Sequence, residues 1–157
     1  MWFLVLWALG IISAVVHMFI VGFPEAIEEI SRIVLLYQFI VTFGLVGLIG
    51  TYINIFDAEN TAKKLGWPGG LFQIKYGFSQ LGIGVMGILA IWLHGNFWAA
   101  TLVTMYIYGL SGLWSHTSVM IKEKKVSAME LGNIIMDICY QGFITALSII
   151  AGGIWVR

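Results

Sequence analysis

Long apolar segments are the feature that most constrains what this chain can fold into. Five stretches are mostly apolar over about 20 residues or more, which is the length that an α-helix needs to cross the hydrocarbon core of a membrane. They cover residues 2–22, 33–55, 72–93, 97–121 and 131–156. The connections between them are too short to hold a soluble domain. The sequence therefore predicts one all-α membrane domain over residues 1–157, a bundle of five transmembrane helices, or four if one segment is short or re-entrant.

The composition supports this interpretation and narrows the classes of function. Of the 157 residues, 60% are hydrophobic and only 10% are charged, which is far less charge than a soluble domain carries. The charges also cancel, so no basic surface for nucleic acid is expected. The lipid bilayer is the predicted partner, with a second copy of the chain or a membrane complex as further partners. The sequence shows no phosphate loop, zinc motif or catalytic triad, so no catalytic residue, metal or cofactor is predicted and a non-enzymatic role is favoured.

The distribution of basic residues predicts an orientation. Five spans place the N terminus and the connections 56–71 and 122–130 on the same side of the membrane. That side carries six lysines: Lys63, Lys64, Lys75, Lys122, Lys124 and Lys125. The other side carries Arg32 and Arg157. Because basic residues favour the cytoplasmic side, the sequence predicts a multi-pass cell-membrane protein with its N terminus inside and its C terminus outside.

Stripes of small residues predict how the helices pack. Residues spaced by three and four share one face of a helix. On the third segment such a stripe holds two glutamines and three glycines: Gln73, Gly77, Gln80, Gly84 and Gly87. The second segment has a matching stripe: Gly44, Gly47, Thr51 and Asn54. Small residues allow helix backbones to approach closely in lipid, so these stripes are predicted to be packing surfaces.

Polar residues from several segments are predicted to meet in the inner leaflet. At a rise of about 1.5 Å per residue, His116 and Asp137 lie about 7 and 9 Å from the inner ends of their helices, and Gln80 lies about 10 Å from its own. Tyr140 and Asn133 fall at similar depths. A carboxylate inside a bilayer needs a partner or water, so an Asp137–His116 pair is predicted, with the other three residues beside it. The cluster would bind or pass a proton or a small polar solute, as in a transporter.

Three other interpretations remain open. The polar groups could act only as interhelical glue, which is the favoured interpretation for Gln80 alone. The chain could also serve a larger assembly as an accessory subunit. A membrane redox subunit or enzyme is the third alternative, with haem or a quinone bound near His17, His94 or His116.

One segment also carries a family resemblance. The stretch "GWPGGLFQIKYGFSQLGIGVMGILAIWLHGNFWAAT", residues 66–101, combines a tryptophan–glycine start, the Phe72–Gln73 pair, a glycine-spaced helix and a short loop with Asn96, Phe97 and Trp98. In these features the chain resembles family 6790 of the domains of unknown function, small polytopic membrane proteins of bacteria and archaea. The family pattern has an acidic residue where this chain has Lys75. The resemblance implies a compact helical bundle in the cytoplasmic membrane and no particular reaction. In size and hydropathy the chain is also similar to DoxX-like proteins.

Overall fold

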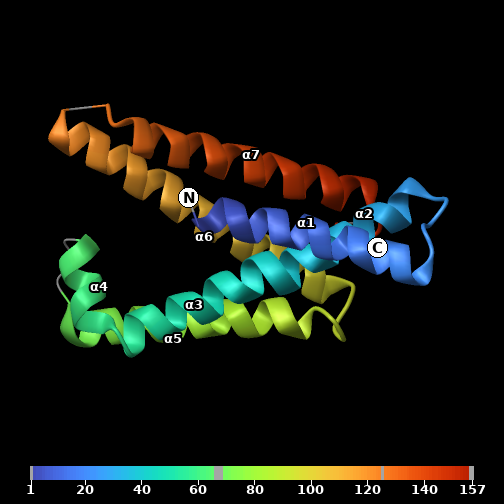
Figure 1. Ribbon diagram of the computed structural model, residues 1–157, viewed down its shortest axis with the longest axis horizontal. Helices are drawn as coiled ribbons and strands as arrows, with labels where there is room; N and C mark the ends of the chain where they lie inside the picture. Colours follow the sequence, from blue (N-terminus) through green and yellow to red (C-terminus); the bar gives the residue numbers. More distant parts are fainter. Residues whose placement is uncertain (1, 66–68, 125, 156–157) are drawn as a thin grey trace.

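The computed structural model describes residues 2–65, 69–124 and 126–155 and is all-helical over those ranges. The elements in chain order are α1 (Trp2–Val21), α2 (Ile27–Tyr37), the π-helix η1 (Gln38–Phe43), α3 (Gly44–Ile55), α4 (Ala58–Leu65), α5 (Gly70–Leu89), α6 (Asn96–Glu123) and α7 (Ala128–Ile150). Figure 1 shows the long helices side by side along one axis, with the short α4 crossing one end. The predicted all-α class is confirmed.

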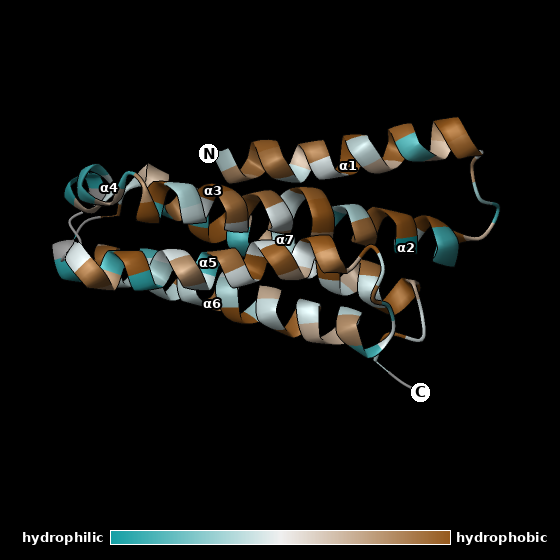
Figure 2. Ribbon diagram, turned by 90° about the horizontal axis from the view of Figure 1, so that it is seen from below, coloured by the Kyte–Doolittle hydropathy of each residue, from teal (hydrophilic) through white to brown (hydrophobic). Residues whose placement is uncertain are grey.

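Three helical segments are long and apolar enough to cross a membrane. They are Trp2–Val21, Ile27–Ile55, which joins α2, η1 and α3, and Ala128–Ile150. The helices α5 and α6 are also long, but glutamine, lysine, serine and histidine side chains lower their hydropathy. Figure 2 shows the contrast, with mainly brown turns along α1, interrupted by white and teal, and more white along α6. The five predicted segments thus correspond to five long helical stretches, of which three qualify as spans by length and composition.

The boundaries differ most from the predicted ones in the second and fifth segments. The second segment begins at Ile27 and not at residue 33, because an amphipathic turn with Glu28 and Glu29 continues directly into the apolar part. The fifth segment is helical from Ala128 and ends at Ile150, so the predicted end at 156 is too late. Gly152 and Gly153 follow with positive φ angles, which end the helix. Residues 66–68, Lys125 and Arg157, on which the resemblance and the charge count partly depended, lie outside the described residues.

The second long segment changes its helical winding at its centre. Residues Gln38–Phe43 form a π-helix between two α-helical parts. Thr42 Oγ1 lies 2.8 Å from Gln38 Oε1 and 3.1 Å from the carbonyl oxygen of Leu6 on α1. Gln38 and Thr42 are fully buried. The hydrogen bond from Thr42 to Leu6 therefore links the π-helix η1 to α1 in the core of the bundle.

The closest packing in the molecule joins α3 to α5. A Cβ atom added at Gly47 would overlap the backbone nitrogen of Gly84, and one added at Gly84 would lie 3.1 Å from the carbonyl oxygen of Gly44. The buried residues of α5 are Gln73, Gly77, Gln80, Gly84 and Gly87, which is the predicted stripe. We call this surface the glycine seam, formed by Gly44, Gly47 and Gly50 with Gly77, Gly84 and Gly87. The prediction that these glycines serve helix packing is confirmed.

The remaining helices complete the bundle around a mainly apolar core. α6 packs chiefly on α7, and α2 with η1 bridges between α1, α5 and α7. Arg32 fixes α2 to the end of α7 by donating hydrogen bonds to the carbonyl oxygens of Ala151 and Gly152, at 2.8 and 3.0 Å. The α3–α5 pair and the α6–α7 pair lie closer together at this end and diverge toward the end that carries α4 (Figure 1). That divergence determines where a cavity can form.

Candidate functional site

A polar cavity of about 890 Å³ lies between the two diverging helix pairs. Its walls come from the first turn of α1, from η1 and α3, from α4 and α5, and above all from α6 and α7. The polar side chains that line it are Lys64, Tyr76, Tyr108, Ser111, Ser115, His116, Glu130, Asn133, Asp137, Tyr140 and Gln141. We call this space the polar cavity. It contains four of the five predicted binding residues, Asp137, His116, Tyr140 and Asn133.

An ion pair between the two longest helices stands in the cavity wall. His116 Nδ1 on α6 lies 2.5 Å from Glu130 Oε2 on α7. The side chain of His116 is 31% exposed and that of Glu130 is 14% exposed, so the pair is partly shielded from solvent. The sequence analysis assigned Glu130 to a connection. The earlier start of α7, at Ala128, brings this residue into the first helical turn and within reach of His116.

Asp137 lies in the same wall, closer to the middle of α7. Its Oδ2 atom is buried and accepts no hydrogen bond within the described part of the chain. A Cβ atom added at Gly112 on α6 would come within 3.0 Å of that oxygen, so the glycine makes room for the carboxylate. His116 is close enough to act on Asp137 electrostatically. The predicted direct contact between the two is not formed, because His116 bonds Glu130 instead.

The other predicted residues divide between the cavity and the core. Asn133 and Tyr140 both line the cavity, and Tyr140 is only 3% exposed. Gln80 instead lies in the glycine seam, with its side chain against Gly50. It reaches the cavity only indirectly, since Tyr76 and Tyr108 interact through their side chains with each other and with Gln80. Periodicity alone did not predict a role for these tyrosines, although Tyr76 is next in sequence to Gly77 of the predicted stripe on α5.

Further polar contacts in the seam explain the second glutamine of α5. Gln73 Nε2 donates a hydrogen bond to Asn54 Oδ1, and Asn54 Nδ2 donates to the carbonyl oxygen of Gly50 at 2.7 Å. Thr51 Oγ1 lies 2.8 Å from the carbonyl oxygen of Gly47 and 3.3 Å from that of Gly77. The bond between Gln73 and Asn54 and the bond from Thr51 to Gly77 join α3 and α5, whereas the other two lie within α3. Gln73 and Asn54 therefore act within the packing of the seam.

The three histidines have separate surroundings. His17 Nδ1 is 3.1 Å from the hydroxyl of Tyr37, and His94 Nε2 is 3.1 Å from the carbonyl oxygen of Ile91. His116 is in the ion pair with Glu130. The described residues contain no group of three or more His, Cys, Asp or Glu side chains that could hold a metal ion. Haem or quinone binding near these residues stays a prediction. The visible absorbance spectrum of the purified protein tests for haem, and the ultraviolet spectrum of a solvent extract tests for a quinone.

These features define an all-helical protein with three helices of membrane-spanning length and a cavity lined by ionisable side chains. The chain belongs to DUF6790, a family of unknown function, whose pattern matches residues 1–152. The predicted family resemblance is confirmed, and the match extends well beyond the segment on which the resemblance was based. No curated protein and no solved structure matches the chain at a significant level.

Proposed function

We propose that this chain is a multi-pass membrane protein whose polar cavity binds a small polar solute or a proton from the cytoplasmic side. The polar cavity carries the proposal, because it combines His116, Glu130 and Asp137 in one space between helices. Ionisable groups are costly inside a bilayer, where each adds about 2.5–3.5 kcal/mol on insertion scales, and they usually serve a function there.

The outer surface of the bundle supports placement in a membrane. Large apolar side chains point outward along the helices, including Phe19 and Ile20 on α1, Leu110 on α6 and Ile138 on α7. A soluble monomer rarely exposes a continuous apolar surface of this extent. We infer that α5 and α6 complete the membrane domain together with the three more apolar segments, which gives five spans.

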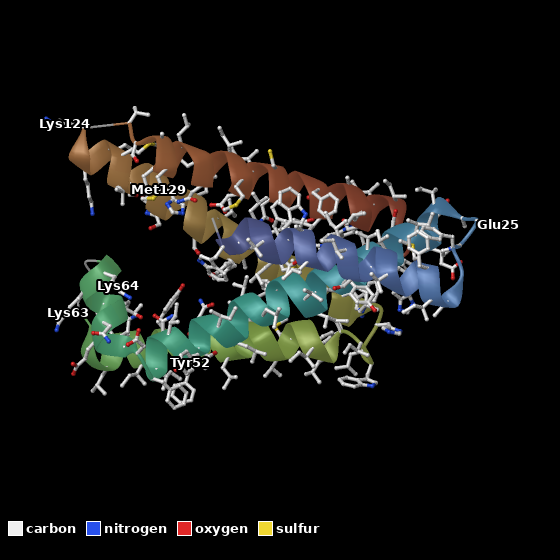
Figure 3. The ribbon with its side chains drawn as sticks, in the orientation of Figure 1. Glu25, Tyr52, Lys63, Lys64, Lys124 and Met129 are labelled. Carbon is white, nitrogen blue, oxygen red and sulfur yellow. The ribbon has the colours of Figure 1, made fainter. Side chains whose placement is uncertain are left out.

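The charges at the two ends support the cytoplasmic orientation. Lys63 and Lys64 on α4 and Lys124 after α6 lie at one end of the molecule, and Glu25 lies at the opposite end (Figure 3). The cavity is at the lysine-bearing end, since Lys64 is in its wall. By the positive-inside rule that end faces the cytoplasm, which places the C-terminal end of α7 outside.

Cysteine labelling tests both the cavity and its orientation. Both variants are made in a Cys139→Ser background. Ser115→Cys places a thiol in the cavity wall. Leu110→Cys places a thiol on the outer apolar surface, at a position where the native leucine is 62% exposed. A charged, membrane-impermeant thiol reagent should modify Ser115→Cys in inside-out vesicles and leave Leu110→Cys unmodified. Labelling at Ser115→Cys in intact cells, or equal labelling at both sites, would contradict the proposal.

A further inference from the structure

The α7 wall of the polar cavity carries three unpartnered polar atoms in consecutive turns. They are Asp137 Oδ2, the Tyr140 hydroxyl and Gln141 Oε1, each of them buried and without a hydrogen bond of standard geometry among the described residues; the Tyr140 hydroxyl also lies near Thr42 on η1. Two of these atoms can only accept hydrogen bonds, and the hydroxyl can accept or donate. All three side chains line the cavity. A molecule that satisfies this wall must therefore bring hydrogen-bond donors.

The facing helix α6 holds these side chains in place. Gly109 leaves space for the Gln141 amide, whose Nε2 donates to the carbonyl oxygen of Met105 at 3.4 Å and so leaves the amide oxygen as the free end. Gly112 leaves space for the Asp137 carboxylate. The two glycines thus fit the acceptor groups into the wall, and a side chain at either position would displace one of them.

No basic side chain in the described cavity wall forms an ion pair with Asp137. Four charged or titratable side chains apart from tyrosines line the space: Lys64, His116, Glu130 and Asp137. His116 is bonded to Glu130. Lys64 is exposed on α4, on the wall opposite α6 and α7, and forms no ion pair with a described residue. A carboxylate in such a setting binds a cation more readily than a neutral molecule, because the low dielectric strengthens the attraction.

The walls contributed by α1, η1 and α5 carry several aromatic side chains. Trp2 and Phe3 on α1, Phe43 on η1 and Phe72 on α5 line the same space. The ring of Phe3 meets that of Tyr140 edge to face, with centroids 4.8 Å apart. Aromatic faces attract organic cations, and the combination of an aromatic wall with a carboxylate is well suited to an ammonium group on an apolar body.

We propose that the polar cavity binds an alkyl- or arylammonium cation, with the ammonium group against Asp137, Tyr140 and Gln141 and the apolar part against the aromatic wall. The assignment rests on the proposed function, since it names the class of solute for the same cavity. An ammonium group supplies three donors, which matches the three unpartnered atoms in number and kind.

Three probes with the same phenylethyl body test the charge requirement directly. Phenethylammonium, 2-phenylethanol and 3-phenylpropanoate share an aromatic body and differ in the polar end. Binding of each to the full chain in lipid nanodiscs is measured by isothermal titration calorimetry, with empty nanodiscs as the blank. Saturable binding of phenethylammonium, at least tenfold tighter than that of the other two, is expected. Equal binding of the alcohol, or tighter binding of the carboxylate through Lys64, would overturn the assignment.

Variants then locate the ammonium group. Asp137→Asn keeps the shape of the side chain and removes its charge, so phenethylammonium should bind about tenfold or more weakly. Tyr140→Phe should cost a smaller factor, about two- to fivefold, and keeps the test informative if the first variant is poorly folded. Asp57→Asn, outside the cavity, is the matched control and should bind as the wild type does. Unchanged binding in both cavity variants would refute the proposal. The proposed function is tested separately, by the cysteine labelling at Ser115→Cys and Leu110→Cys.

Discussion

The glycine seam and the polar cavity both involve α3 and α5, and small residues serve different purposes in the two regions. In the seam, Gly47 and Gly84 bring two backbones into direct contact, and no side chain fits between them. In the cavity wall, Gly109 and Gly112 face the ends of side chains, Gln141 and Asp137. The difference teaches that a stripe of small residues on a helix predicts close approach, but not whether the approaching atoms are backbone or polar side chains. Backbone contact in the seam holds α3 and α5 rigidly together. The glycines in the cavity wall leave space for the polar side chains of Gln141 and Asp137.

The largest expected effect is overpacking of the seam. Gly47→Leu adds a branched side chain where a Cβ atom already overlaps the backbone of α5. Because a backbone cannot rotate away, the loss in stability should reach the upper end of the usual overpacking range, about 3 kcal/mol or more. Gly82→Leu is the control, since no atom lies within 4 Å of a Cβ added there. Thermal unfolding in detergent measures both, and equal melting temperatures would show that the α3–α5 contact is not tight.

An intermediate effect is expected from the ion pair of the cavity. In a double-mutant cycle, His116→Ala and Glu130→Ala should show a coupling energy of about 1 kcal/mol, because the two side chains are bonded and partly shielded. The matched cycle of His116→Ala with Asp137→Ala should give a coupling below about 0.5 kcal/mol, as for residues without direct contact. Chemical or thermal unfolding of the four proteins in each cycle provides the values. A larger coupling to Asp137 would restore the pair that the sequence predicts.

The smallest effect is expected from a glycine of the cavity wall. Gly109→Ala places a methyl group against the end of the Gln141 side chain, which can rotate into the cavity. The stability loss should therefore stay below about 1 kcal/mol, partly offset by the higher helix propensity of alanine. The same unfolding assay compares it with Gly47→Ala, which meets backbone. Similar losses in the two variants would remove the distinction between seam and cavity.

Much of the fold follows from periodicity in the sequence. The spacing of Gly77, Gly84 and Gly87 placed them on one face of a helix, and the structure buries that face against α3. The ranges of the apolar segments matched the long helices to within a few residues, except where Glu28 and Glu29 extended the second one and where glycines ended the last. Family membership was also recognisable from the residues of one segment. These features depend on the spacing and type of residues that are near one another in the chain, which can be read directly from the sequence.

The composition of the cavity depended on tertiary structure. Depth along each helix predicted that His116, Asp137, Asn133 and Tyr140 lie at one level. In the structure all four line the polar cavity. It could not show that His116 would bond Glu130, since this choice depends on where α7 begins and how α6 and α7 turn toward each other. Nor could depth alone show that Gln80 would face the seam while Tyr76 and Tyr108 face the cavity.

The sequence by itself therefore determined the helical class, the approximate helix limits, the stripes of small residues and the heights of the polar groups. The tertiary structure decided which polar groups meet, how α3–α5 and α6–α7 diverge, and that a cavity of about 890 Å³ lies between them. The physical reason is that helix periodicity and hydropathy are properties of neighbouring residues. The rotation of each helix about its axis, and so the partner of each side chain, is set by packing among all the helices at once.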